Sequence, residues 1–251
     1  MGLVWQHNLG VIQAYKEETA KVSNVVIDMG KPEAEAKMAA LTRDEAERLL
    51  RKLDVLAPSD MQPFIAKIVG ENVEQIITLV RMVKAEAKGE FLGHLGTGNA
   101  LDIRWLRPKD VGGALLNPAA TAACGLYGGA SGGIFTWTQT FVANTAQSII
   151  PAQTMAEEAG CIHLGIIDPV DVPKCDAIQF FIATIPGPAQ PLPFNIREGF
   201  GTNDLCIARF EQPVIIGPEK TQRVDVMPNL AGDSKLQLLT LVVARAQAMV
   251  L

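Results

Sequence analysis

The chain has 251 residues, of which 48% are hydrophobic, and its formal charge is −5. This length suffices for one large domain, or for a medium domain with a smaller attachment. No stretch reaches the roughly 18 uncharged apolar residues that a membrane helix needs, and no basic stripe is present that would neutralise nucleic-acid phosphates. We therefore expect neither a transmembrane segment nor sequence-independent binding to nucleic acid.

Residues 1–98 are predicted to form an N-terminal arm and a helical region. Within the first 29 residues the pattern fits either an extended arm, with residues 22–27 as a short strand, or an amphipathic helix. Thr42 and Glu45 then have the spacing of a capping box, which marks the start of a helix. The apolar stripe of this helix consists of Ala46, Leu49, Leu50 and Leu53.

A second, longer helix is predicted to begin after Ser59 and Gln62, which have the same spacing as the first capping box. It is expected to extend to residue 88, with Gly70 as a candidate kink and Gly89 as the C-terminal cap. Its apolar face contains Val73, Ile76, Ile77, Val80 and Val83. Two or three helices packed on each other, or against a sheet, account for this region.

Residues 99–251 are predicted to form an antiparallel β-sandwich domain. In residues 134–142 threonine alternates with bulkier residues at the period of two that is typical of a strand, and we expect the domain to be organised around it. Other strand-like runs, separated by glycine and proline turns, are residues 101–106, 147–150, 161–167, 177–185, 205–210, 214–216, 221–227 and 236–244. About eight short strands with a turn roughly every ten residues are typical of a sandwich or barrel. The run 236–244 is interpreted as a buried central strand, with a helix as the alternative.

Residues 111–173 contain no lysine or arginine. A solvated surface normally mixes both signs of charge, so we expect this segment to be buried in a core or between subunits. Together with the high hydrophobic content, this predicts that the chain is not a monomer. A large, well-filled core is the alternative explanation of the composition.

Ser131 lies in the sequence Gly-Ala-Ser-Gly-Gly, which matches the GxSxG pattern of serine hydrolases. That chemistry needs a strand before the serine and a helix after it, whereas here a small-residue loop precedes and a strand is predicted to follow. We therefore do not expect Ser131 to be a nucleophile. The glycines of residues 93–98 are not followed by the Lys-Ser/Thr pair of a phosphate-binding loop.

The remaining candidates for chemistry are few and scattered. Glu157 with Glu158, and Asp168 with Asp171, are expected to be solvated carboxylates in turns, and His163 a hydrogen-bonded residue within a strand. Phe135 and Trp137 fit a core or a contact patch. Cys124, Cys161, Cys175 and Cys206 are interpreted as small buried hydrophobic residues, because no CxxC pair is present. We expect no catalytic, cofactor-binding or metal-ligating residue, no cofactor and no enzymatic activity.

The order of the elements resembles that of viral capsid and coat proteins, in which a helical or extended arm precedes a β-sandwich, frequently a jelly roll. The small-residue, uncharged loops also resemble those of capsid proteins. So does the final run, which consists of residues 213–216, a Gly-Pro turn, residues 221–227 and an apolar last strand. It covers most of the chain and is architectural, without a diagnostic motif. The chain departs from many RNA-virus coats because it lacks a basic arm, which fits a shell whose genome is packaged by a motor or neutralised by other proteins.

This resemblance implies an α+β fold with a jelly-roll-like sandwich. It also implies a structural protein that self-assembles into a shell, and most specifically a viral major capsid protein. Its partners would be copies of itself, with other shell proteins as further candidates and no sequence-specific nucleic acid. Its location would be the virion, assembled in the host cytoplasm. The alternatives are a phage tail, baseplate or surface-layer module, and a β-sandwich enzyme or carbohydrate-binding domain that uses loop carboxylates.

Overall fold

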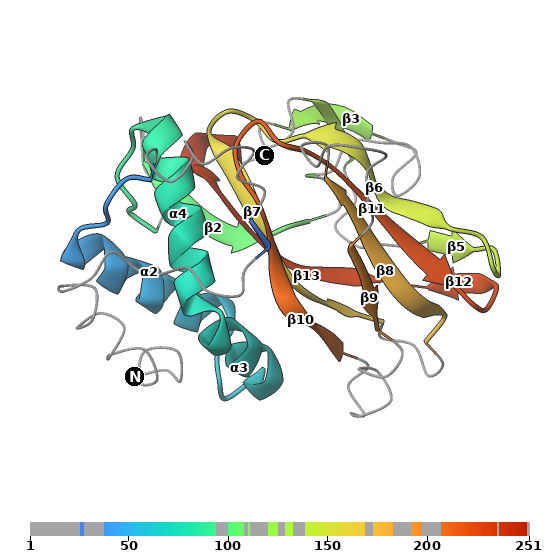
Figure 1. The fold of residues 1–251 in the computed structure, drawn as a ribbon. Helices are drawn as coiled ribbons and strands as arrows, with labels where there is room; N and C mark the ends of the chain where they lie inside the picture. Colours follow the sequence, from blue (N-terminus) through green and yellow to red (C-terminus); the bar gives the residue numbers. More distant parts are fainter. Residues whose placement is uncertain are drawn as a thin grey trace.

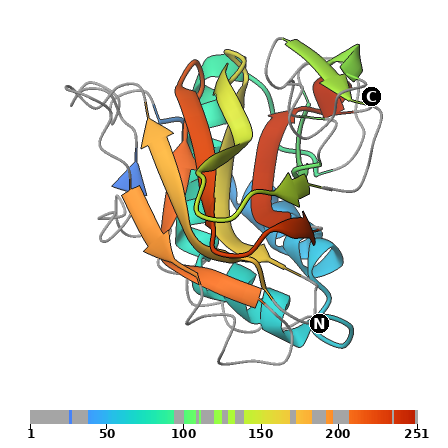
Figure 2. The ribbon, with the colours of Figure 1, turned by 90° about the vertical axis from the view of Figure 1, so that its right-hand side faces the viewer.

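The fold is of the α+β class, with helices on one side of mostly antiparallel sheets (Figure 1). It is a computed structural model that describes residues 26–27, 38–93, 100–107, 110, 120–124, 129–132, 139–168, 173–182, 192–196, 207–234 and 236–249. The helices cover one face of a five-stranded sheet, and a four-stranded sheet covers the other face. In Figure 2, which looks from the side of the four-stranded sheet, the helices lie behind the strands.

The helices are α2 (Arg43–Leu56), α3 (Pro63–Glu71) and α4 (Val73–Ala87). The capping box at the start of α2 is confirmed, since the Thr42 hydroxyl accepts a hydrogen bond from the Glu45 amide at 3.3 Å and the Glu45 carboxylate accepts one from the Thr42 amide at 2.8 Å. The second predicted capping box is wrong. Helix α3 begins with a proline at its first position, and Gln62 precedes it without a side-chain cap.

The single long helix that the sequence predicts is divided into α3 and α4 at Asn72. The backbone of Asn72 leaves the helical region, with φ −115° and ψ 20°, and its side-chain amide donates to the Ile68 carbonyl at 2.8 Å. That bond satisfies a carbonyl at the end of α3, so the break lies at Asn72 and not at Gly70. At the end of α4, Lys88 and not Gly89 takes the left-handed conformation, with φ 50°.

The strands of the two main sheets are long and nearly all antiparallel. The five-stranded sheet has the order β1 (Val26–Ile27), β10 (Ile207–Ile216), β7 (Ala159–Ile167), β13 (Gln237–Arg245), β2 (Leu101–Trp105), and β1 alone among these runs parallel to its neighbour. The four-stranded sheet has the order β6 (Gln147–Thr154), β11 (Thr221–Pro228), β8 (Cys175–Ile182), β9 (Leu192–Asn195). Two further pairs are β12 (Gly232–Ser234) with β5 (Gln139–Phe141), and β3 (Ala120–Cys124) with β4 (Gly129–Gly132). A short 3-10 helix, η3 (Ala246–Met249), follows β13.

The strand expected to organise the domain, residues 134–142, is not a central one. Its described part forms β5, which pairs with β12 in a sheet that has two strands among the described residues, and residues 133–138 lie outside them. The central positions belong to β7 and β13, which have neighbours on both sides and are buried almost throughout. The interpretation of residues 236–244 as a buried central strand is therefore confirmed.

Two other expectations about the strands need correction. Pro151 was expected to end a strand, but it lies inside β6, an edge strand where a missing backbone donor is tolerated. The runs 205–210 and 214–216 were expected to be separate strands. Their described residues join in β10, whose pairing with β7 shifts between Arg209 and Val214.

Alternate side chains of β7 and β13 enter two different hydrophobic cores. One core lies between the sheets and includes Cys161, Val242 and residues of β8 and β11. The other lies under the helices and joins Ile162, Leu241 and Val243 to the helical stripe. The predicted apolar faces of the helices are confirmed, because all of their named members are buried, namely Ala46, Leu49, Leu50, Leu53, Val73, Ile76, Ile77, Val80 and Val83.

Replacing Gly165 by alanine should destabilise the five-stranded sheet. A Cβ at this position of β7 would lie 2.5 Å from the Ala208 carbonyl oxygen of β10, so one of the two backbones has to move. We expect Gly165→Ala to lower the free energy of unfolding by about 1–3 kcal/mol, measured by urea denaturation. The matched control is Gly70→Ala in α3, where a Cβ meets nothing within 4 Å and helix propensity should raise stability by up to about 1 kcal/mol. Equal stabilities of the two variants would contradict the close approach of β7 and β10.

Replacing Ile77 by aspartate should be strongly destabilising, because it places an unpaired carboxylate in the core under the helices. Ile77 is 5% exposed, and we expect a loss of several kcal/mol in urea denaturation. Val55→Asp in α2 is the control, since Val55 is 73% exposed and a surface change should stay within about 0.5 kcal/mol. If Ile77→Asp unfolds at the same urea concentration as the control, α4 does not pack as described.

Candidate functional site

Ser131 lies within a strand. Residues 129–132 form β4, which is paired with β3 so that Ser131 is opposite Ala122. A nucleophile elbow instead needs its serine at a sharp turn between a strand and a helix. The backbone around Ser131 therefore does not offer the geometry that the GxSxG pattern would require. Of the glycines in residues 93–98, only Gly93 lies in the described part of the chain.

His163 is fully buried and bonded on both ring nitrogens, which confirms the expectation of a hydrogen-bonded strand residue. Its Nδ1 lies 2.7 Å from the Thr240 hydroxyl, and its Nε2 lies 2.7 Å from the Gln222 side-chain oxygen. The amide nitrogen of Gln222 in turn donates to the Cys161 sulfur at 3.4 Å. With the Gln222 oxygen as acceptor, the proton of the neutral imidazole sits on Nε2, and Nδ1 accepts from Thr240.

This burial keeps the imidazole neutral at pH 7. Burial lowers the pKa of His163 from 6.5 to about 4, although the hydrogen bond to Gln222 acts in the opposite direction. A neutral imidazole with both nitrogens bonded has no free lone pair with which to take a proton from a nucleophile. His163 is therefore not arranged as a general base for Ser131 or for any other residue. Neither Gln222 nor Thr240 was singled out from the sequence.

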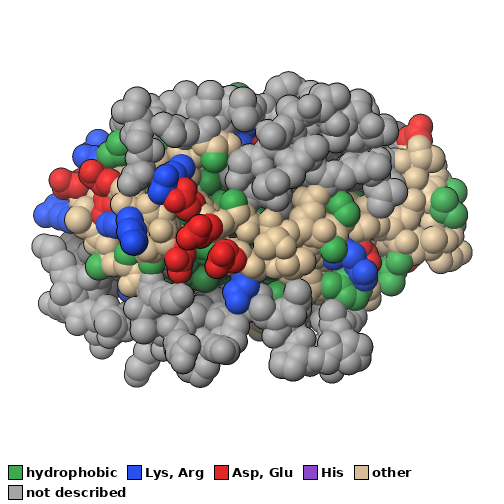
Figure 3. All heavy atoms as spheres, turned by 90° about the horizontal axis from the view of Figure 1, so that it is seen from above, with side chains coloured by type: hydrophobic (Ala, Val, Ile, Leu, Met, Phe, Trp, Pro, Cys, Tyr) green, Lys and Arg blue, Asp and Glu red, His purple; other side chains and the backbone are tan. Residues whose placement is uncertain are grey.

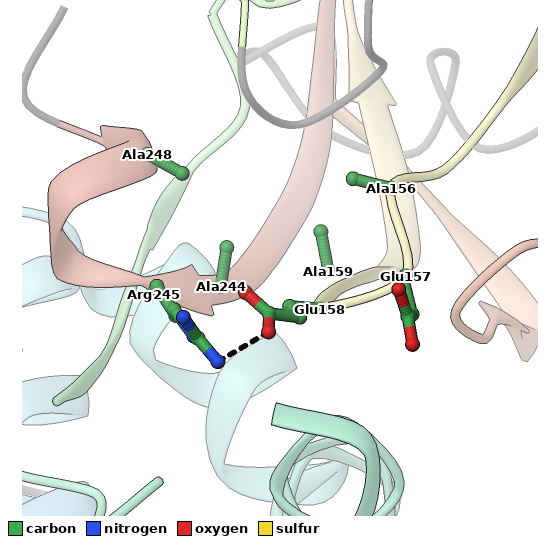
Figure 4. A pocket seen from close by; sticks show the side chains of 7 residues that line it. All are labelled: Ala156, Glu157, Glu158, Ala159, Ala244, Arg245 and Ala248. Carbon is green, nitrogen blue, oxygen red and sulfur yellow. Dashed lines mark ion pairs between the residues drawn. The ribbon is translucent and has the colours of Figure 1, made fainter. Parts of the chain in front are cut away.

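Glu157 and Glu158 line a pocket at the turn between β6 and β7 (Figure 4). Its volume is about 330 Å³, and most of its other lining residues are alanines, namely Ala156 of the same turn, Ala159 of β7, Ala244 of β13 and Ala248 of η3. Arg245 closes one side, forms an ion pair with Glu158 and donates to the Ala87 carbonyl at 3.2 Å. In Figure 4 the Glu157 carboxylate points away from this pair.

The pocket is poorly suited to general acid–base catalysis. Glu158 lies in the turn, as expected, and is 34% exposed, but its charge is compensated by the guanidinium of Arg245. Glu157 is exposed, as expected. General acid–base chemistry by two carboxylates requires them to converge on one substrate position, whereas these two diverge.

Asp168 also differs from the expected solvated carboxylate. It is completely buried at the end of β7, and its carboxylate accepts a hydrogen bond from the Lys174 amide at 3.0 Å. It thereby closes the connection to β8, and its partner in the predicted pair, Asp171, lies outside the described residues. Phe135, Trp137 and Cys206 lie outside them as well.

Cys161 and Cys175 are both buried, as the interpretation of the cysteines predicts. Burial raises the pKa of Cys175 to about 12, with the charges of Asp168 and Asp176 adding to the effect, so this thiol is not a nucleophile at neutral pH. In the described part of the chain, His, Cys, Asp and Glu nowhere gather in a group of three that could hold a metal. No helix among the described residues is long and apolar enough to cross a membrane.

The described surface is unevenly charged. In the view of Figure 3, acidic and basic side chains gather toward the helical end on the left, and the opposite end shows few of them. Four large hydrophobic side chains of the described residues are exposed: Val55 and Met61 near the end of α2 and before α3, and Val142 and Leu230 beside the β5–β12 pair. An end with few charges and with exposed apolar side chains is a feature of surfaces that contact other proteins.

Comparison of this chain with models of protein families, with curated proteins and with solved structures gives no match.

Ser131→Ala should change neither ester hydrolysis nor the assembly state. The serine lies in a strand, and the nearest histidine in sequence, His163, is occupied by two hydrogen bonds. Hydrolysis of p-nitrophenyl acetate and light scattering of parent and variant should coincide. Hydrolysis that the parent shows and Ser131→Ala loses would overturn this structural interpretation of the segment.

Proposed function

We propose that this chain is a structural subunit that assembles with copies of itself into a shell, and more specifically a viral major capsid protein with a jelly-roll sandwich. The observation that carries the proposal is the order in which the strands pair. Apart from the two-residue β1, the main sheets contain β2, β6, β7, β8, β9, β10, β11 and β13.

These eight strands pair from the outside of the chain inwards. The first pairs with the last (β2 with β13), the second with the seventh (β6 with β11), the third with the sixth (β7 with β10) and the fourth with the fifth (β8 with β9). Two more pairings, β7 with β13 and β8 with β11, join the four pairs into two sheets. A long antiparallel hairpin that is wound up into two facing sheets has this nested pairing, which is the pattern of a jelly roll.

The space between the two sheets supports a structural role. Jelly rolls occur in capsid proteins, in lectins and in cupins, and the last two need a ligand site. Here the described residues between the sheets form a core with the aromatic cluster Phe180, Phe194 and Phe210, whose ring centroids lie 4.9–5.8 Å apart. With a filled interior, and with the helices covering the five-stranded sheet, the ends of the sandwich and the outer face of the four-stranded sheet are the surfaces on which such a protein acts.

The segment without lysine or arginine supports contacts between copies. Of the strands in residues 111–173, β7 is buried within its sheet, whereas β6 is partly exposed and Val142, next to β5, is 56% exposed. Interfaces between proteins are depleted of charge in their centres, so such a surface fits contact with another copy of the chain or with another shell protein. The proposed location is the virion, assembled in the host cytoplasm, without sequence-specific binding to nucleic acid. A tail, baseplate or surface-layer module would use the same contacts.

Particle images of the purified protein test this proposal. At micromolar concentration, light scattering should give a species far heavier than the 26.9 kDa chain, and negative-stain images should show closed particles. Open sheets, tubes or fibres would favour the tail or surface-layer alternative. A stable species near the mass of one chain, without particles at any salt concentration, would contradict a self-assembling subunit.

A further inference from the structure

One polar cluster lies inside the otherwise apolar core between the two sheets. His163 belongs to β7 and Thr240 to β13, both in the five-stranded sheet, whereas Gln222 belongs to β11 in the four-stranded sheet. The 2.7 Å bond between His163 Nε2 and the Gln222 oxygen therefore joins one sheet directly to the other. The proposed shell function makes no use of this cluster.

The contacts of His163 leave a protonated imidazole without a counter-charge. From its own strand it meets Cys161, from β13 Thr240, from β11 Gln222, and from β8 the Phe180 ring, at 4.8 Å between centroids. Its neighbour in the pairing of β10 with β7 is Val214. The thiol of Cys161 is the one titratable group among these described contacts, and no carboxylate is among them.

The charged groups of β11 and the carboxylate at the end of β7 have other partners. Arg223 and Asp225 of β11 alternate with the inward-facing Gln222 and Val224 and form an ion pair at 3.1 Å. Asp168, at the end of β7, accepts from the Lys174 amide. The thiol of Cys175, in the same core, is kept protonated by burial, which raises its pKa to about 12. None of the contacts described for these groups brings a negative charge to the imidazole.

We propose that His163 is an acid-sensitive latch between the two sheets. In the neutral state Nδ1 accepts a hydrogen bond from the Thr240 hydroxyl. When Nδ1 takes up a proton from water, that hydroxyl can no longer donate to it, and a positive charge stands in an apolar core. The charged form is better solvated when the sheets separate and water reaches the ring, so protonation favours the open state.

The sign of the effect follows from the direction of the pKa change. The imidazole titrates at 6.5 when exposed and at about 4 in the closed structure, so the closed state binds the proton less well. The stabilisation of the closed state by the neutral imidazole is complete above pH 6.5 and declines as the pH falls toward 4. Between pH 7 and pH 5 the equilibrium constant for closing should fall roughly 20-fold from this group alone.

Hydrogen–deuterium exchange followed by mass spectrometry tests the latch on the full chain, whatever its assembly state. Peptides from β6, β8 and β11 are compared from pH 7 to pH 4.5, after correction for the intrinsic exchange rate. In the parent, protection should fall roughly 20-fold by pH 5. In His163→Gln, whose amide supplies a hydrogen-bond donor and acceptor but cannot ionise in this range, that fall should be absent.

A second variant supplies the missing counter-charge. Gln222→Glu places a carboxylate against the ring, so the imidazolium becomes favourable and protection of β6, β8 and β11 should persist to pH 5. Gln237→Glu is the matched control, because Gln237 is exposed at the start of β13 and gains the same charge away from the ring. The control should behave like the parent.

Two outcomes would overturn the latch. Parallel loss of protection in the parent and in His163→Gln would show that other groups carry the acid response. Identical profiles of Gln222→Glu and Gln237→Glu would show that a charge beside the ring makes no difference, and this comparison decides the question even if His163→Gln does not fold. Because exchange is measured on single chains and particles alike, a monomer with the predicted profile would support the latch and contradict the shell.

Discussion

The structure depends on one constraint: the five-stranded sheet is covered on both faces. A strand at its centre has to present apolar side chains in both directions, so β13 is apolar from Leu238 to Ala244 except at Thr240. A polar side chain in such a strand needs an internal partner, and Thr240 finds His163 of the neighbouring β7. The helical layer and the second sheet are the two covers that this arrangement requires.

The helical layer is held by a buried charge. Glu45 is 1% exposed, and besides capping α2 it accepts hydrogen bonds from Lys84 of α4 at 2.6 Å and from the Phe91 amide at 3.0 Å. Burial alone would raise the pKa of Glu45, but the hydrogen bonds from Lys84, Thr42 and Phe91 and the charge of Lys84 together lower it. One carboxylate thus ties α2, α4 and the segment leading to β2, so this buried ion pair has a structural explanation.

Local patterns predicted what depends on local chemistry. The capping box of Thr42 and Glu45 involves four consecutive residues, and the sequence predicts it correctly. The alternation in residues 134–142 is equally clear, yet it does not indicate that β5 pairs with β12 and lies outside the two main sheets. Contacts between distant residues left no signal in one sequence: Gln222 lies 59 residues from His163, and Thr240 lies 77 residues from it. A run such as 236–244 fits a buried strand or a buried helix by pattern alone, and its pairing with β7 and β2 decides between them.

The nested pairing of the strands also determines when the molecule can fold during synthesis. β2 is the first strand of the main sheets after the helices, and its partner β13 is the last in chain order. Contacts so distant in sequence form slowly, because a long loop must close before they are gained. Until β13 has been made, one edge of β7 lacks its neighbour and remains open to pairing with other chains. The sheet is therefore completed only once β13 has been synthesised, and incomplete chains that are made close together have to be kept apart until then.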